Sequence, residues 1–223
     1  YNGEITYHDE HMGAFLDGLA QRGLDGDTLV VITNDHGEEL GEHGRWGHGH
    51  SLYDELLRDP VAMRYPPLFP AGKRVADPVE DVDLAPTILE VAGVDPIPGV
   101  DGESLVPLVR GGRVARPLYA VAEFLDHARA VRVGRWKLIR GAGGASELYD
   151  VEADPTEKTN RADDAPIALR LCEVMLGEAI ATPTKRKRLE ERSRVRKFES
   201  GNANIDPELR KQLEALGYLG GGG

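Results

Sequence analysis

The sequence of 223 residues has one cysteine, Cys172, so no disulfide can form within the chain. A single thiol does not indicate the redox compartment. No apolar run approaches 18 residues, so the sequence predicts no membrane-spanning helix. The chain opens on Tyr1 without a signal peptide, and we expect upstream residues to be missing. Localisation stays open, with a periplasmic or secreted protein as one option and any signal peptide outside this chain.

Basic residues are also scarce, with 27 Lys and Arg against 38 Asp and Glu and a net charge of -11. A nucleic-acid-binding protein would carry a basic face, so we expect no nucleic-acid partner. Small anionic esters are still possible ligands, because a bound metal sets the local charge. Residues 184–198 hold eight Lys or Arg against two Glu. We interpret them as a solvated helix or mobile segment, with contact to an anionic polymer as the alternative.

One stretch, residues 28–50, concentrates the chemically active side chains. It opens with four apolar residues at 29–32, which predict a strand buried on both faces within a parallel sheet. Asp35 and His36 follow Asn34, so they are expected at the carboxyl edge of that sheet, where α/β folds place ligands.

Asp35 and His36 offer a carboxylate beside an imidazole, which can form half of a divalent metal site. The alternative is that Asp35 only caps a following helix. Two further features favour the metal site. Glycines recur nearby, at positions 37, 41, 44, 47 and 49, and permit close approach of the backbone to a ligand. Four of the seven histidines also lie within 15 positions: His36, His43, His48 and His50.

The remaining sequence alternates helical and strand patterns. Helices are predicted over residues 4–22, 83–93, 165–180 and 206–216. Strands are predicted over residues 61–65, 118–121, 128–133, 136–139 and 147–150, the last four as a small antiparallel sheet. Ser51 is expected to cap a short helix over residues 52–58. The helix at 83–93 is expected to bury Leu84, Ile88, Leu89 and Val91.

Three motifs carry a family resemblance: residues 35–38 (DHGE), 40–44 (LGEHG) and 46–48 (WGH). Together they resemble the metal-site segment of the sulfatases, in the alkaline phosphatase superfamily. The resemblance extends back to residues 1–5 and Asp9. It extends forward to residues 51–55, 83–87 and 147–150, and so covers about residues 1 to 160 in the order and spacing of the family.

The resemblance implies an α/β fold, the C-terminal part of an alkaline phosphatase-like core followed by a small antiparallel sheet subdomain and a helical tail. The implied domain limits are 1–115 for the core with a partial metal site, 116–160 for the small sheet and 161–223 for the tail.

The resemblance also implies a metal-dependent sulfuric ester hydrolase acting on a small-molecule or glycan sulfate ester. Asp35 and His36 would bind the metal, with calcium expected and zinc as the alternative. His48 stands where related sulfatases often hold a Lys or His that contacts the substrate anion, and His50 competes for this catalytic role. His43 and Glu38 are weaker candidates.

The sulfatase nucleophile, a formylglycine made within a C/S-x-P-x-R motif, does not occur in this sequence. We expect it in a missing N-terminal part, so this chain alone should be inactive and should self-associate through exposed edges. Cys172 is interpreted as a structural thiol. Two alternatives stay open. One is a phosphoryl-ester or phosphonate hydrolase or phosphoethanolamine transferase of the same superfamily, and the other is a non-catalytic scaffold.

Overall fold

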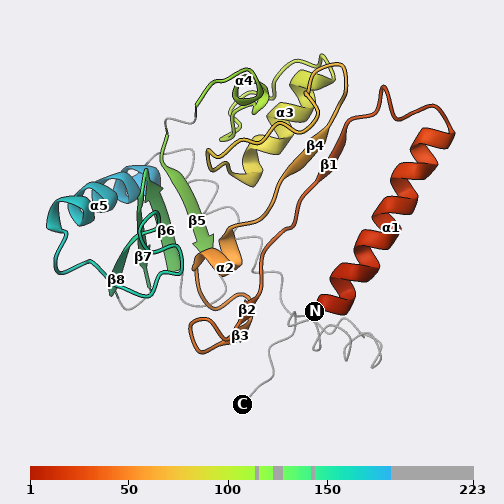
Figure 1. Ribbon diagram of the computed structural model, residues 1–223. Coiled ribbons are helices and arrows are strands. Elements are labelled where there is room, and N and C mark those ends of the chain that lie inside the picture. The colour runs from red at the N-terminus through yellow and green to blue at the C-terminus, as the bar shows by residue number, and fades with distance from the viewer. Residues whose placement is uncertain (114–115, 123–127, 142–143, 182–223) are drawn as a thin grey trace, which may run out of the picture. The chain divides into compact units, whose positions relative to one another are not determined.

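The computed structural model describes residues 1–113, 116–122, 128–141 and 144–181 (Figure 1). They form two compact units. Residues 1–34 and 60–115 make up unit 1, and residues 35–59 make up unit 2 with the chain from residue 116 onward. The stretch at 35–59 therefore associates with the C-terminal sheet, whereas the sequence-based limits at 115 and 160 remain a proposal. The predicted helix at 206–216 and the basic residues 184–198 lie outside the described residues.

Unit 1 begins with helix α1 (Asn2–Gln21), which confirms the predicted helix. Gly23 ends it with a positive φ of 68°, a left-handed conformation that glycine adopts without strain. Two bonds complete this cap: Gly23 N–H donates to Ala20 O at 2.9 Å and Leu24 N–H to Leu19 O at 3.0 Å. No residue of α1 is buried within the described residues.

Strand β1 (Val30–Ile32) pairs with β4 (Ala62–Arg64), so the two predicted strands do share a sheet. The pairing is antiparallel, with Val31 opposite Met63, and the predicted parallel arrangement is wrong for this pair. Burial on both faces is also wrong, because Ile32 is 36% exposed. The apolar run indicates a strand, but it does not encode direction, and β4 is the one partner of β1 among the described residues.

The helix predicted at 83–93 consists of a 3₁₀ turn, η1 (Asp81–Asp83), and α3 (Leu84–Val91). Its predicted buried face is partly wrong, since Ile88 is 42% exposed while Asp83, Pro86 and Thr87 are buried. The short helix α4 (Val106–Val109) packs against α3.

Hydrogen bonds explain why polar residues occupy the buried face of α3. The Thr87 hydroxyl donates to Asp83 O at 2.6 Å and accepts the Leu105 N–H at 2.8 Å. The Asp83 carboxylate accepts the Glu103 N–H at 2.9 Å. Buried polar groups that are hydrogen-bonded in this way are tolerated in a protein interior, so they replace the apolar contacts expected from the sequence.

Unit 2 contains the predicted antiparallel sheet, in the order β5-β6-β7-β8 (Figure 1). Its strands are β5 (Leu118–Ala122), β6 (Ala128–Val133), β7 (Trp136–Arg140) and β8 (Ser146–Asp150). Helix α5 (Pro166–Ala181) confirms the helix predicted at 165–180. It packs on β6 and β7. Their shared core comprises Val131, Leu138, Leu148, Cys172 and Leu176.

Residues 35–59 add a hairpin and a short helix to unit 2. The hairpin pairs β2 (Glu39–Leu40) with β3 (Trp46–Gly47), and the helix is α2 (Asp54–Leu57). Ser51 does not cap α2, which corrects the sequence prediction, because its hydroxyl donates to Glu39 instead at 3.1 Å. Within the described part of the chain, no helix is long and apolar enough to cross a membrane.

Candidate functional site

Asp35 and His36 lie side by side at the start of unit 2. The Asp35 side chain is 83% exposed, and its Oδ2 lies 3.9 Å from His36 Nε2. His36 Nδ1 lies 2.8 Å from Gly37 O, and a carbonyl can only accept, so we assign the donated proton to Nδ1. In the neutral ring, Nε2 then carries the lone pair and lies on the side of Asp35. A neutral imidazole with such a lone pair is the form of histidine that binds a metal.

His48 packs against this pair. Its ring centroid lies 4.1 Å from that of His36, and its Nδ1 lies 3.3 Å from Glu38 Oε1. The structure therefore brings Asp35, His36, Glu38 and His48 together from two places in the sequence. Glu38 braces His48, which matches the lesser role that the sequence suggested for it.

His50 faces a different carboxylate. Its Nε2 lies 2.7 Å from Glu39 Oε2, and Glu39 is fully buried. The Ser51 hydroxyl donates to the same Glu39 oxygen. A serine nucleophile needs its hydroxyl hydrogen-bonded to a base such as histidine, and here Ser51 is bonded to the carboxylate, so this group does not form such an arrangement.

Gly37 fixes where His36 lies relative to α2. Its N–H donates to Leu56 O at 3.0 Å. A Cβ at this position would lie 1.9 Å from Glu55 O, so no other residue fits without displacing the backbone. The sequence suggested only that this glycine allows close approach, and the structure identifies α2 as its neighbour.

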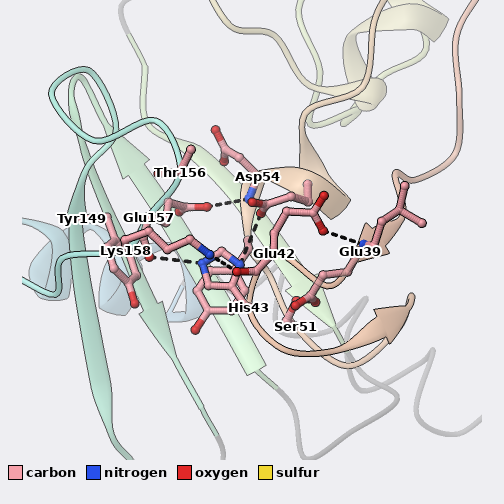
Figure 2. Close-up of polar contacts among 12 residues, drawn as sticks. Glu39, Glu42, His43, Ser51, Asp54, Tyr149, Thr156, Glu157 and Lys158 are labelled. Atoms are coloured by element: carbon pink, nitrogen blue, oxygen red, sulfur yellow. Dashed lines mark hydrogen bonds and ion pairs between the residues drawn. The ribbon is translucent and has the colours of Figure 1, made fainter.

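A buried lysine, Lys137 on β7, was missed by sequence reasoning. Its Nζ lies 2.6 Å from Asp54 Oδ1 and 2.8 Å from Glu157 Oε1. The Asp54 N–H donates to Glu157 Oε2 at 2.6 Å, as drawn in Figure 2. Lys137 is 3% exposed and Glu157 1%. The only sequence signal was a lysine inside an apolar strand, which suggests a buried carboxylate partner.

Burial raises the pKa of the Glu157 carboxyl, and Lys137 acts in the opposite direction. A raised carboxyl pKa gives stability below the unfolded value, and this contribution is lost as pH rises through the folded value. Lys137→Met removes the cation and leaves the buried Glu157 carboxylate and the half-buried Asp54 carboxylate without it, so we expect a loss of about 3 to 5 kcal/mol at neutral pH. The loss should shrink towards pH about 4, where Glu157 binds a proton. Denaturant unfolding at both pH values measures this, and a loss independent of pH would contradict it.

His43 has a structural environment. Its ring stacks on Tyr53 at 3.7 Å, and its Nε2 lies 3.2 Å from Glu157 O. The Tyr53 hydroxyl donates to Glu147 at 2.8 Å, and burial with this bond raises the pKa of Tyr53 to about 12. Figure 2 shows the same area, where Lys158 Nζ donates to Glu42 O. These contacts attach the tip of the β2–β3 hairpin to the residues that follow β8.

Cys172 is fully buried in the core beneath α5. Burial raises the pKa of its thiol to about 11. A nucleophilic cysteine needs a lowered pKa and exposure, so the structural role predicted for Cys172 is confirmed.

A divalent metal would find two donor groups here, Asp35 and His36. Two atoms bound to one metal at roughly 2.0 to 2.5 Å lie 3 to 4 Å apart, and the observed 3.9 Å fits this. The described residues hold no group of three or more His, Cys, Asp or Glu side chains that could bind a metal. The pair by itself therefore fits part of a divalent metal site and does not complete one.

Comparison with known proteins identifies the family. The family model for N-sulphoglucosamine sulphohydrolase, C-terminal, matches residues 41–176. The chain belongs to the sulfatase family. The chain is 34% identical over 170 residues to choline-sulfatase of Rhizobium meliloti, covering 74% of this chain and 33% of that protein. It is 32% identical over 188 residues to N-acetylglucosamine-6-O-sulfatase of Bacteroides thetaiotaomicron, covering 78% and 34%.

Solved structures support the alkaline phosphatase-like fold of this chain. BT4656, solved in complex with its substrate D-glucosamine-2-N,6-O-disulfate, matches with a TM-score of 0.69 and 30% identity, over 79% of this chain and 40% of that one. Phosphonate monoester hydrolase of Agrobacterium radiobacter matches with a TM-score of 0.65 and 29% identity, over 81% and 39%. The predicted fold class is confirmed. The chain spans about one third of the length of its curated relatives.

Proposed function

We propose that the protein containing this chain is a metal-dependent sulfuric ester hydrolase. Asp35, His36 and His48 are the residues of this chain that act in the reaction. The observation that carries the proposal is their juxtaposition in a sulfatase chain, with 3.9 Å between the first two side chains and 4.1 Å between the two imidazole rings. Substrates of this class are small-molecule or glycan sulfate esters, and BT4656, whose substrate is a sulfated glucosamine, supports the glycan option.

Asp35 and His36 have one role in this proposal, and His48 has another. Asp35 and His36 would hold the metal, and calcium, with zinc as the alternative, suits an oxygen and nitrogen donor pair. When bound, the metal supplies positive charge that offsets the charge of the ester anion. His48, whose Nδ1 lies 3.3 Å from Glu38 Oε1, would act on the substrate anion, where an imidazole neutralises charge or protonates the leaving oxygen.

The nucleophile lies outside this chain in the proposal. A formylglycine from a C/S-x-P-x-R motif is the expected group. Cys172 and Ser51 are poor substitutes, because Cys172 is buried and the Ser51 hydroxyl is bonded to Glu39. This chain alone should therefore have no activity. Its self-association stays a prediction, which its mass in solution would test.

A phosphoryl or phosphonate ester hydrolase is the second candidate, because a phosphonate monoester hydrolase matches about as well as the sulfatases do. The test assays the enzyme made from its complete coding sequence with 4-nitrophenyl sulfate, 4-nitrophenyl phosphate and phenyl 4-nitrophenyl phosphonate. We expect kcat/KM to be largest for the sulfate, with this chain alone as the inactive control. A higher kcat/KM for either phosphorus ester would contradict the sulfatase proposal.

A further inference from the structure

We propose that Lys137 on β7 is a positioning residue for the metal-site pair, acting through α2 and Gly37. The inference rests on the proposed function, because it concerns the placement of His36 in that site. Independently of that function, the position of residues 35–37 depends on the charge of Lys137 in the antiparallel sheet. Three successive contacts, all within unit 2, connect Lys137 to His36.

The first step joins the sheet to α2. Lys137 Nζ contacts the carboxylate of Asp54, the first residue of α2, at 2.6 Å. Glu157 contacts both partners: its Oε1 lies 2.8 Å from Lys137 Nζ, and its Oε2 accepts the Asp54 N–H at 2.6 Å. The start of α2 is thereby fixed by one buried cation and one buried carboxylate, both of which need each other for charge balance.

The second step joins α2 to the metal-site pair. Leu56 O, within α2, accepts the N–H of Gly37 at 3.0 Å. The approach is so close that a Cβ on Gly37 would lie 1.9 Å from Glu55 O. A contact this tight transmits a shift of α2 directly to the backbone of Gly37, because packed groups have no room to absorb it.

The third step joins Gly37 to the side chains of the site. His36 is its neighbour, and the His36 ring is oriented by the Gly37 carbonyl at 2.8 Å. The His48 ring packs on it at 4.1 Å. Partners that orient a metal-binding histidine typically change metal affinity by roughly 10- to 100-fold when removed. Lys137 does not contact His36 itself, and we expect it to act on the ring in the same direction through α2 and Gly37.

The alternative is that Lys137 only stabilises unit 2 without influencing the site. The strand itself offers a matched control, Arg140, which forms a 2.8 Å ion pair with Glu173 of α5 and is 41% exposed. Arg140→Met and Lys137→Met each remove one cation from β7. Of these two cations, Lys137 pairs with Asp54 in residues 35–59 and Arg140 pairs with Glu173 of α5, so the two variants separate positioning from general stability.

The experiment uses the enzyme made from its complete coding sequence and has two readouts. Hydrogen exchange of the Gly37 amide is measured against the amides of β6, and the calcium dissociation constant is measured by titration calorimetry. We expect Lys137→Met to accelerate Gly37 exchange at least about 10-fold relative to β6 and to weaken calcium binding roughly 10- to 100-fold. Arg140→Met should change neither. Equal effects of the two variants, or a lower melting temperature with unchanged Gly37 exchange, would overturn the proposal.

If Lys137→Met fails to fold, Glu157→Gln takes its place. The glutamine keeps an acceptor for the Asp54 N–H and removes the negative charge that faces Lys137. We expect a smaller acceleration of Gly37 exchange in the same direction, and no acceleration would overturn the proposal. Because hydrogen exchange needs no substrate, this result stands whether or not the enzyme hydrolyses sulfate esters, so the two proposals fail separately.

Discussion

Asp35→Ala should remove the bound divalent metal and bring ester hydrolysis below detection. The Asp35 carboxylate is the anionic member of the pair, its side chain is 83% exposed, and it lies 3.9 Å from His36 Nε2. Its loss deprives the metal of an oxygen ligand, and calcium relies on oxygen ligands for its six to eight positions. Metal analysis and turnover of 4-nitrophenyl sulfate by the complete enzyme measure both effects.

Asp25→Ala is the matched control for this variant. Asp25 also carries an exposed carboxylate, which pairs with Arg64 at 3.2 Å in unit 1. Exposed ion pairs contribute about 0 to 1 kcal/mol, so this variant should keep full metal content, turnover and fold. Full metal occupancy in Asp35→Ala would show that Asp35 is not a ligand.

Much of the local structure could be predicted from the sequence because its signals are local. Gly23 and Gly93 end α1 and α3 with positive φ angles of 68° and 66°, and Gly134, with φ of 60°, makes the turn between β6 and β7. The limits of β6 and β7 at this turn therefore followed from the chain itself. The helix α5 followed from its apolar period in the same way.

Contacts between distant residues could not be predicted. Lys137 and Asp54 are 83 positions apart, and Asp54 and Glu157 are 103 apart. A single sequence contains no information about which buried carboxylate a buried lysine will meet. The direction of β1 was missed for a similar reason, because strand pairing depends on a partner and not on the apolar run alone.

The contacts of the histidines could be predicted only in part. The cluster itself was evident from the sequence, but its division between two carboxylates was not. Glu38 and Glu39 are neighbours in the sequence, yet His48 lies against Glu38 while His50 lies against the buried Glu39. This difference separates the two candidates that the sequence left as competitors.

His48→Ala should lower kcat by roughly 10²- to 10⁴-fold, the range for loss of a group that transfers a proton or neutralises charge in the reaction. Its ring is 20% exposed and its partner Glu38 28%, so the stability of the fold should change by no more than about 1 kcal/mol. Steady-state kinetics and thermal unfolding of the complete enzyme test both statements.

His50→Ala should show the opposite pattern. It removes the imidazole that lies 2.7 Å from the fully buried Glu39 carboxylate and leaves the Ser51 hydroxyl as a donor to the same oxygen. Loss of one hydrogen-bond partner from a buried charged group costs about 1 to 3 kcal/mol. Turnover at a temperature where the variant is folded should fall far less than in His48→Ala. Should His50→Ala instead show the large kinetic loss while His48→Ala retains normal turnover, the role of contacting the substrate anion would pass to His50. Glu39 would then be the carboxylate that orients the acting histidine, in place of Glu38.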